Sequence, residues 1–238
     1  MALILSIETA TNICSIALSK DGMLLSVEES SARNTHSAVI TLLIEKVFAN
    51  AGKDFPEIDA IAAGEGPGSY TGLRIGVATA KGLCYALGKP LIAVSTLQAL
   101  SVGMKDALFS LPDINKNKPT LFCPMIDARR MEVYCAIYDS SGKEIRKPAA
   151  EIITENSFAE YLDDHILVFA GDGALKCKPL LENHEHAIFM DNVAASAKYM
   201  AVLAEGKFSE NKFEDISCFE PFYLKDFVAG KAKVKGLQ

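Results

Sequence analysis

The sequence lacks the features typical of membrane proteins and of disulfide-bonded or zinc-bound frameworks. Its longest stretch without a charged residue, Pro90–Met104, is shorter than the roughly 20 apolar residues that a membrane span requires, and it includes serine, threonine and glutamine. The N-terminus has no basic segment and Glu8 interrupts its apolar run, so we expect no signal peptide and a cytoplasmic location. The six cysteines form no C-x-x-C pair, which predicts buried thiols in a reducing compartment.

A basic excess is also missing. The chain has 24 Lys and Arg against 30 Asp and Glu, a formal net charge of −6, whereas a protein that binds nucleic acid on its own is normally basic. Apolar residues make up 50% of the 238 residues, and a disordered chain would have far fewer. The composition therefore predicts a folded, mildly acidic globular protein.

The first half of the chain predicts three strands followed by alternating helices and strands. The Asp21-Gly22 pair is typical of a hairpin turn, and Gly52 is placed to end a helix. The predicted elements are strands at 2–8, 12–19 and 23–29, a helix at 36–51, a strand at 58–63, a helix at 71–87, a strand at 91–94 and a helix after 95.

The same order of elements recurs in the second half. Gly22 follows Glu8 by 14 residues, and Gly142 follows Asp127 by 15. The predicted strands are at 120–126, 132–139, 144–153, 166–170 and 187–190, with helices at 157–163, shortly after 173, and at 194–205. This repeat predicts an α/β protein with the duplicated actin-like (ribonuclease-H-like, ASKHA) fold, in which helices flank two mixed sheets. We expect subdomains at 1–110 and 111–238, with a linker at 112–119 and the last helix and tail packing back on the first subdomain.

A glycine-rich loop between a strand and a helix is the strongest local feature. Glycines allow close approach, and a helix N-terminus offers free N–H groups to an anion, so the loop is a candidate phosphate site. A tight turn without a ligand is the alternative, and no Gly-Lys-Ser/Thr follows to make it a Walker loop. The candidate phosphate-facing residues are Gly66, Gly68, Ser69, Thr71 and Gly72.

The two helices at 36–51 and 71–87 carry unusual side chains for elements that pack on one sheet. The first is apolar around much of its circumference, and the second has small residues at four-residue intervals, which predicts a close helix–helix approach and an association surface. Burial of both helices inside the monomer is the alternative. The predicted contact stripe is Val39, Leu43, Val47, Gly72, Gly76 and Ala80.

Two acids, Glu8 and Asp127, each end the first strand of a half. Acids at these positions could hold a metal–nucleotide, but Thr9 follows the first where a glycine would admit a phosphate, and a local salt bridge explains the second equally well. His36 has Ile40 rather than a second ligand four residues later, so we predict no metal site.

Several segments resemble the bacterial TsaB (YeaZ) family. The strongest match is Gly66–Gly76 (Gly-Pro-Gly-Ser-Tyr-Thr-Gly-Leu-Arg-Ile-Gly), and 7–10, 127–134 and 221–225 support it. The resemblance implies a non-catalytic subunit, without a cofactor of its own, of the machinery that makes N6-threonylcarbamoyladenosine at position 37 of tRNA. It also implies descent from the same ancestor as the catalytic subunit TsaD, whose metal-binding His-x-Glu-Gly-His helix is missing here, since His36 stands alone.

The resemblance further implies the partners. A TsaD-like subunit would dock on the two N-terminal helices, the chain alone would form a homodimer through the same face, and a TsaE-like ATPase would be the third protein. The tRNA would be reached through the complex, and residual ATP or ADP binding at a partner interface stays open. The alternatives are an actin-like nucleotidase or kinase that uses Glu8, Asp127 and the glycine loop, and a glycoprotease-like metallopeptidase.

Overall fold

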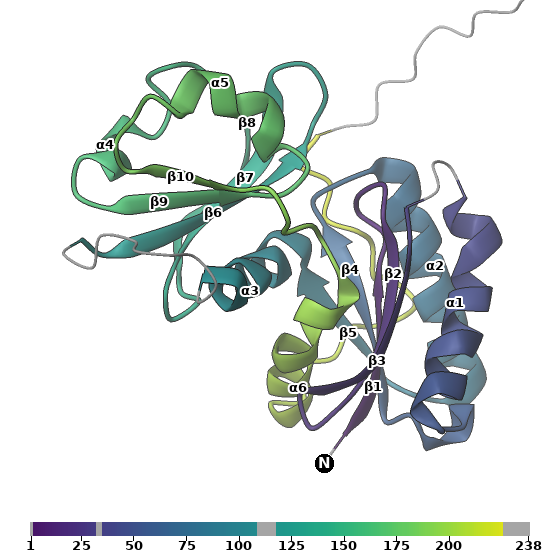
Figure 1. Cartoon of the computed structure of the whole chain (residues 1–238). Coiled ribbons are helices and arrows are strands. Elements are labelled where there is room, and N and C mark those ends of the chain that lie inside the picture. The colour runs from purple at the N-terminus through teal and green to yellow at the C-terminus, as the bar shows by residue number, and fades with distance from the viewer. Residues whose placement is uncertain (1, 32–34, 109–117, 226–238) are drawn as a thin grey trace, which may run out of the picture.

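The computed structural model describes residues 2–31, 35–108 and 118–225, which form two lobes, each built on a five-stranded sheet (Figure 1). The first sheet has the order β3-β2-β1-β4-β5, and the second has the order β10-β9-β6-β7-β8. In each lobe the first strand lies in the centre, antiparallel to the second and parallel to the fourth. The two halves therefore share one topology, which confirms the predicted duplicated actin-like fold.

The strands keep most of the predicted bounds. The first sheet consists of β1 (Leu3–Glu8), β2 (Cys14–Lys20), β3 (Met23–Ser30), β4 (Ala60–Gly66) and β5 (Leu91–Ser95). The second consists of β6 (Thr120–Asp127), β7 (Glu132–Asp139), β8 (Glu144–Ile152), β9 (Ile166–Ala170) and β10 (Ala187–Met190).

Helices cover both faces of the first sheet. The helices α1 (His36–Ala51) and α2 (Tyr70–Leu87) pack on the face to which Leu5 and Ile7 of β1 point. The short 3-10 helix η2 (Ala197–Met200) and α6 (Ala201–Ser209) pack on the opposite face, against Ile4. This alternation along β1 is what a strand buried on both faces requires. The last helix thus returns to the first lobe (Figure 1).

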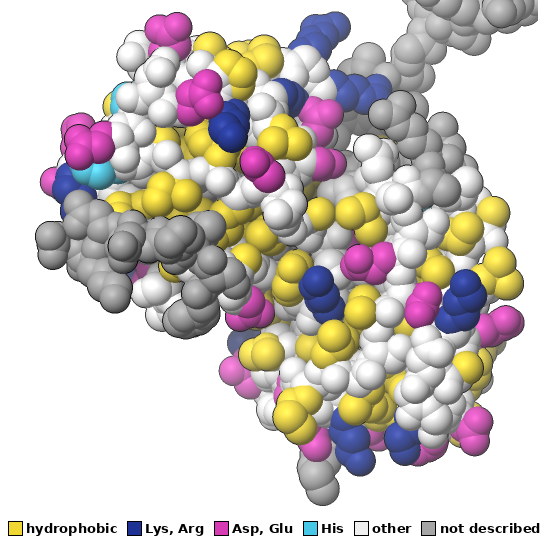
Figure 2. Space-filling model, viewed as in Figure 1, with side chains coloured by type: hydrophobic (Ala, Val, Ile, Leu, Met, Phe, Trp, Pro, Cys, Tyr) yellow, Lys and Arg dark blue, Asp and Glu magenta, His cyan; other side chains and the backbone are white. Residues whose placement is uncertain are grey.

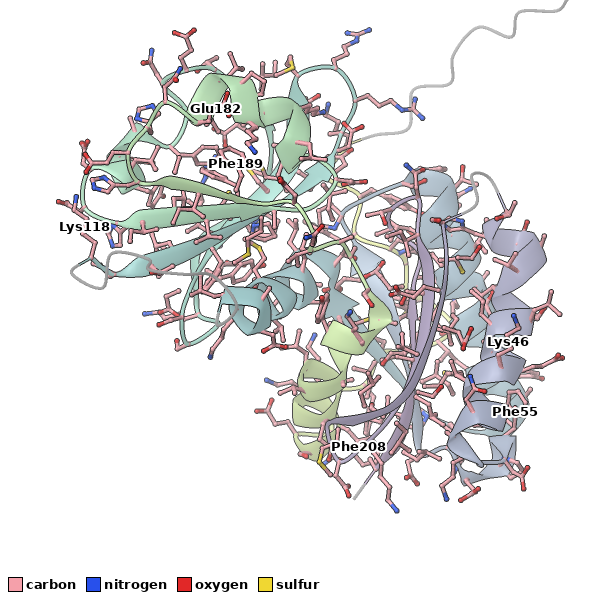
Figure 3. The ribbon with its side chains drawn as sticks, in the orientation of Figure 1. Lys46, Phe55, Lys118, Glu182, Phe189 and Phe208 are labelled. Carbon is pink, nitrogen blue, oxygen red and sulfur yellow. The ribbon has the colours of Figure 1, made fainter. Side chains whose placement is uncertain are left out.

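The second lobe is smaller and its helices are short. They are α4 (Ala159–Leu162) and α5 (Ala174–Leu181), and the labelled Phe189 lies between α5 and the sheet (Figure 3), with its ring stacked on Phe169 at 5.0 Å. The helix α3 (Thr96–Leu108) joins the lobes, because it packs against β4 and β5 of the first sheet and β6 and β7 of the second.

Local sequence signals explain the ends of the main elements. Asp21 and Gly22 both have positive φ, 53° and 74°, as the predicted β2–β3 turn requires. Gly52 and Gly88 end α1 and α2 in the left-handed region, and the Ser69 hydroxyl accepts a hydrogen bond from the Gly72 N–H at 3.3 Å to cap α2.

Four predictions need correction. The strand predicted at 58–63 is shifted to Ala60–Gly66, because parallel pairing with β5 continues as far as Gly66 opposite Ser95. The helix predicted at 157–163 shrinks to four residues, and the last helix begins later and continues to Ser209. Cys218 is exposed, whereas the other five cysteines are buried as predicted. Most of the predicted linker, at 112–119, lies outside the described residues.

None of the helices in the described ranges is long and apolar enough to cross a membrane.

A further 3-10 turn, η1 (Phe55–Glu57), connects α1 to β4, and its Phe55 ring stacks on Phe48 of α1 at 4.3 Å.

Candidate functional site: the cleft and the outer face of two helices

A cleft of about 390 Å³ separates the lobes. Its walls come from the β1–β2 connection, the start of α2, the β6–β7 hairpin and the last described segment of the chain. The polar and aromatic lining residues include Thr11, Asn12, Ser69, Thr71, Asp127, Arg129, Asp172 and Tyr223. The predicted loop and the predicted acid Asp127 therefore do meet in one place.

Glu8 does not reach the cleft, because it is completely buried. One carboxylate oxygen accepts the Ala10 N–H at 2.8 Å, and the other accepts the Thr96 hydroxyl at 2.9 Å. Gly64 packs so closely that a Cβ there would lie 2.5 Å from the carboxylate. Burial raises the pKa of Glu8, and these hydrogen bonds offset only part of the rise. The Glu8 carboxylate therefore does not face the cleft in this structure, and the alternative in which it holds a metal–nucleotide stays a prediction.

Asp127 lies at the cleft but its carboxylate is already occupied. It forms an ion pair with Lys176 of α5, and it accepts the Arg129 N–H at 2.8 Å. The predicted local salt bridge to Arg129 or Arg130 is therefore wrong, because the cation that pairs with Asp127 is Lys176, which is distant in sequence. The neighbouring Asp172 accepts the Asp127 N–H at 3.0 Å, and burial raises the pKa of Asp172.

Only glycine fits at two positions of the loop, because the Thr9–Ala10 backbone passes directly over them. A Cβ on Gly68 would lie 2.4 Å from the Ala10 carbonyl oxygen, and one on Gly72 would lie 2.1 Å from that of Thr9. The Ser69 N–H donates to the Ala10 carbonyl oxygen at 2.7 Å, which fixes the loop against this strand connection. A phosphate role for the loop stays a prediction, since packing alone explains its glycines.

The small residues of α2 likewise contact the chain itself. A Cβ on Gly76 would lie 2.2 Å from the Thr9 hydroxyl oxygen, so the close approach is to the β1–β2 connection and not to a neighbouring helix. Five members of the predicted contact stripe are buried within the monomer, and Val39 is half-buried. The buried five are Leu43, Val47, Gly72, Gly76 and Ala80.

Other residues of α1 and α2 face outwards. Leu42 is 54% exposed and Tyr85 is 82% exposed, Ala38 and Ala78 are also exposed, and Ile75 is half-buried. We call these five residues the outer helix face. Hydrophobic side chains over α1 are visible in yellow in Figure 2. Leu42 directly precedes Leu43 and Ile44 in the sequence, so the apolar pattern alone did not predict which side of the helix would be buried.

His36 is a nearly buried histidine whose Nε2 lies 2.9 Å from the Thr11 carbonyl oxygen. Its ring thus has a backbone partner, and Ile40 one turn later is buried in the core. Within the described ranges, no three His, Cys, Asp or Glu side chains gather as a metal site would require.

The last described segment, residues 214–225, belongs to the tail that we expected to pack back on the first subdomain. We call it the C-terminal strap, and it runs from the first lobe to the cleft (Figure 1). The Glu214 N–H donates to the Leu91 carbonyl oxygen at 2.9 Å, and the Phe222 N–H donates to the Glu65 carbonyl oxygen at 2.7 Å. The strap ends in an ion pair between Lys225 and Glu132 of the second lobe.

An aromatic stack fastens the strap to α2. The rings of Tyr70 and Tyr223 lie 4.7 Å apart, and the Arg74 guanidinium lies 4.4 Å from the Tyr70 ring centre. The Arg74 Nε–H also donates to the Tyr223 hydroxyl at 3.4 Å. No signal in the sequence indicated that the end of this segment would reach the cleft and pair with Glu132 of the second lobe.

Comparisons with known proteins agree with this architecture. Residues 27–233 match the family described as TsaD, tRNA N6-adenosine threonylcarbamoyltransferase. The chain is 31% identical over 236 residues to the tRNA threonylcarbamoyladenosine biosynthesis protein TsaB of Escherichia coli (strain K12), covering 96% of both proteins. It is 30% identical to the protein of the same description from Bacillus subtilis (strain 168), over 57% of this chain and 54% of that protein. The solved structure of YeaZ from Pseudomonas aeruginosa superposes with a TM-score of 0.76 at 25% identity, covering 94% of this chain and 100% of that one.

Proposed function

Because the chain belongs to the TsaB (YeaZ) family and is a subunit in tRNA threonylcarbamoyladenosine biosynthesis, we propose that it is a non-catalytic scaffold that activates a TsaD-like catalytic subunit. The observation that carries the proposal is the burial of Glu8. Chemistry in an actin-like cleft needs acids that reach the substrate or its metal, and Glu8 is enclosed by Ala10, Gly64 and Thr96.

The remaining polar groups of the cleft support the same proposal. Asp127 is neutralised by Lys176, and the C-terminal strap contributes Phe222 to Lys225 to the lining of the space between the lobes. The nucleotidase or kinase alternative needs free acids facing an open cleft. Here Glu8 is enclosed, Asp127 is paired, and the C-terminal strap lines part of the cleft.

The outer helix face supports pairing with another protein. Leu42 and Tyr85 expose large apolar surfaces on two helices that pack side by side on one sheet face. Aromatic anchors such as Tyr85 contribute strongly to protein interfaces. We assign this face to the TsaD-like subunit, and to a second copy of the chain when that subunit is absent.

The other partners follow from the same proposal. A TsaE-like ATPase completes the complex, the tRNA is bound mainly by the assembled complex, and the chain works in the cytoplasm without a cofactor of its own. Nucleotide binding at the partner interface is not part of this proposal.

Co-purification tests the assignment of the interface. Leu42→Asp together with Tyr85→Asp places charges on the outer helix face without touching the core, and we expect the TsaD-like subunit to be lost from the purified complex. Val202→Asp is the matched control, since Val202 is a 63% exposed apolar residue on α6, across the sheet. Retention of the partner by the double variant, or its loss from the control, would contradict the assignment.

A further inference from the structure

The tip of the β6–β7 hairpin contains two adjacent arginines in a backbone conformation that arginine rarely adopts. Arg129 has a φ of 69° and Arg130 has a φ of 54°, both in the left-handed region. In this region the Cβ atom crowds the following carbonyl group, and the residues that adopt it are usually glycine, asparagine or aspartate. Residues held in disfavoured conformations cluster at functional sites.

The turn is held in place on both sides. The Arg129 N–H donates to the Asp127 carboxylate at 2.8 Å, and the Glu132 N–H donates to the Arg129 carbonyl oxygen at 3.3 Å. On the other side, the Ile153 N–H donates to the Met131 carbonyl oxygen at 2.9 Å. The two arginines therefore start from a fixed backbone, which lowers the entropy cost of binding.

The charges of this tip are only partly balanced by nearby acids, of which Asp172 lines the same cleft as Arg129. Both arginines are exposed, and within the described ranges neither guanidinium has a carboxylate partner within 4 Å. The acids on either side are already paired, Asp127 with Lys176 and Glu132 with Lys225. Lys and Arg side chains gather on the second lobe close to the end of the described chain, in dark blue in Figure 2. This excess of positive charge stands out on a chain with a net charge of −6.

We propose that Arg129 and Arg130 form an anion site that binds phosphate groups of the RNA substrate. A guanidinium presents paired donors that match a phosphate, and an exposed pair can contact successive phosphates of one strand. The inference rests on the proposed function, because it assigns to this chain a direct contact with the tRNA that the complex modifies.

The surroundings favour an RNA backbone over a free nucleotide. Arg129 lines the cleft, but Arg130 is outside its lining, and Phe222 to Lys225 of the strap occupy another part of the same lining. Glu8, which would be needed near a metal–nucleotide, is buried. An exposed turn at the rim suits an extended polyanion better than a small ligand enclosed in the cleft.

The test is tRNA modification by the complex reconstituted with TsaD-like and TsaE-like subunits, measured against tRNA concentration at several salt concentrations. The variant Arg129→Asn with Arg130→Gly removes both charges and supplies residues that suit the turn. We expect its KM for tRNA to rise about tenfold, with kcat within about twofold and a salt dependence of log kcat/KM smaller by about 1.5 to 2. We also expect its Tm to be equal to or above that of the unaltered protein.

Matched variants separate the possible results. Lys105→Gln with Lys147→Gln removes two exposed charges elsewhere and should leave the KM for tRNA unchanged. Arg129→Gln with Arg130→Gln should raise the KM as the Asn-Gly variant does, which shows that charge and not turn geometry is responsible. An unchanged KM for tRNA, a shift only in the KM for ATP, or a lowered Tm of the Asn-Gly variant would overturn the inference. If tRNA modification did not depend on the unaltered chain at all, the proposed function itself would be overturned.

Discussion

At the scale of single residues, burial separates structural side chains from those available for function. Glu8 occupies the position where an actin-like enzyme would need an exposed acid, yet it accepts hydrogen bonds from Ala10 and Thr96 and contacts no solvent. A buried carboxylate with raised pKa is often a sign of catalysis, but here the enclosure is complete and both carboxylate oxygens accept hydrogen bonds from the protein itself.

Glu8→Gln should make stability less dependent on pH. Because the pKa of Glu8 in the folded state lies above its ordinary value of 4.5, its contribution to stability is fully present below that value and is lost as the pH rises through the folded-state pKa. The stability of the Gln variant relative to the unaltered protein should therefore increase above pH 4.5, by at most about 1.4 kcal/mol per pH unit. Urea unfolding across pH measures this, and a difference independent of pH would contradict it.

Two glycines of α2 provide a second test at this scale. Gly76→Ala places a methyl group against the Thr9 hydroxyl, at 2.2 Å, and should lower the free energy of unfolding by about 1–3 kcal/mol. Gly82→Ala is the control, because a Cβ there meets nothing within 4 Å, and it should raise the free energy of unfolding by up to about 1 kcal/mol. Equal effects of the two substitutions in denaturant unfolding would argue against the close contact with Thr9.

At the scale of elements, the bounds of α1 and α2 could be predicted closely, whereas their buried sides could not. Gly52 and Gly88 end the helices as glycines usually do, which a local pattern reveals. Leu43 and Val47 have the same apolar character as residues of a protein interface, so sequence alone could not separate the buried side of the helices from their exposed side. The exposed Leu42 and Tyr85 emerged only once the sheet was in place.

The C-terminal strap is the element that periodicity could not predict, because it is neither helix nor strand and depends on contacts distant in sequence. Tyr223→Ala should release its end by removing the stack on Tyr70, which is worth about 1 kcal/mol. Hydrogen exchange of the Phe222 amide, which donates to Glu65, should become about fivefold faster. Tyr223→Phe keeps the ring and loses only the long hydrogen bond to Arg74, so its exchange should stay within about twofold. Equal acceleration in both variants would show that the stack does not hold the strap.

At the scale of the whole molecule, the repeated order of elements was enough to predict two sheets of one topology. The hairpin turns at Gly22 and Gly142 follow the acids Glu8 and Asp127 at nearly equal spacing. The two sheets, β3-β2-β1-β4-β5 and β8-β7-β6-β9-β10, have the same strand order, as this repeat predicted. How the two halves contact each other could not be predicted from such local patterns, because the contacts join residues distant in sequence, such as Lys225 and Glu132. The acidic, apolar-rich composition fits a protein that works within a complex.

The most direct test of the account is the formation of modified tRNA in a reaction reconstituted from the TsaD-like subunit, the TsaE-like subunit and this chain. The account predicts that modification depends on this chain, persists with Glu8→Gln, and is lost with Leu42→Asp and Tyr85→Asp together. Modification that proceeds equally without the chain, or that Glu8→Gln abolishes while the complex stays assembled, would contradict a non-catalytic subunit that acts through its outer helix face.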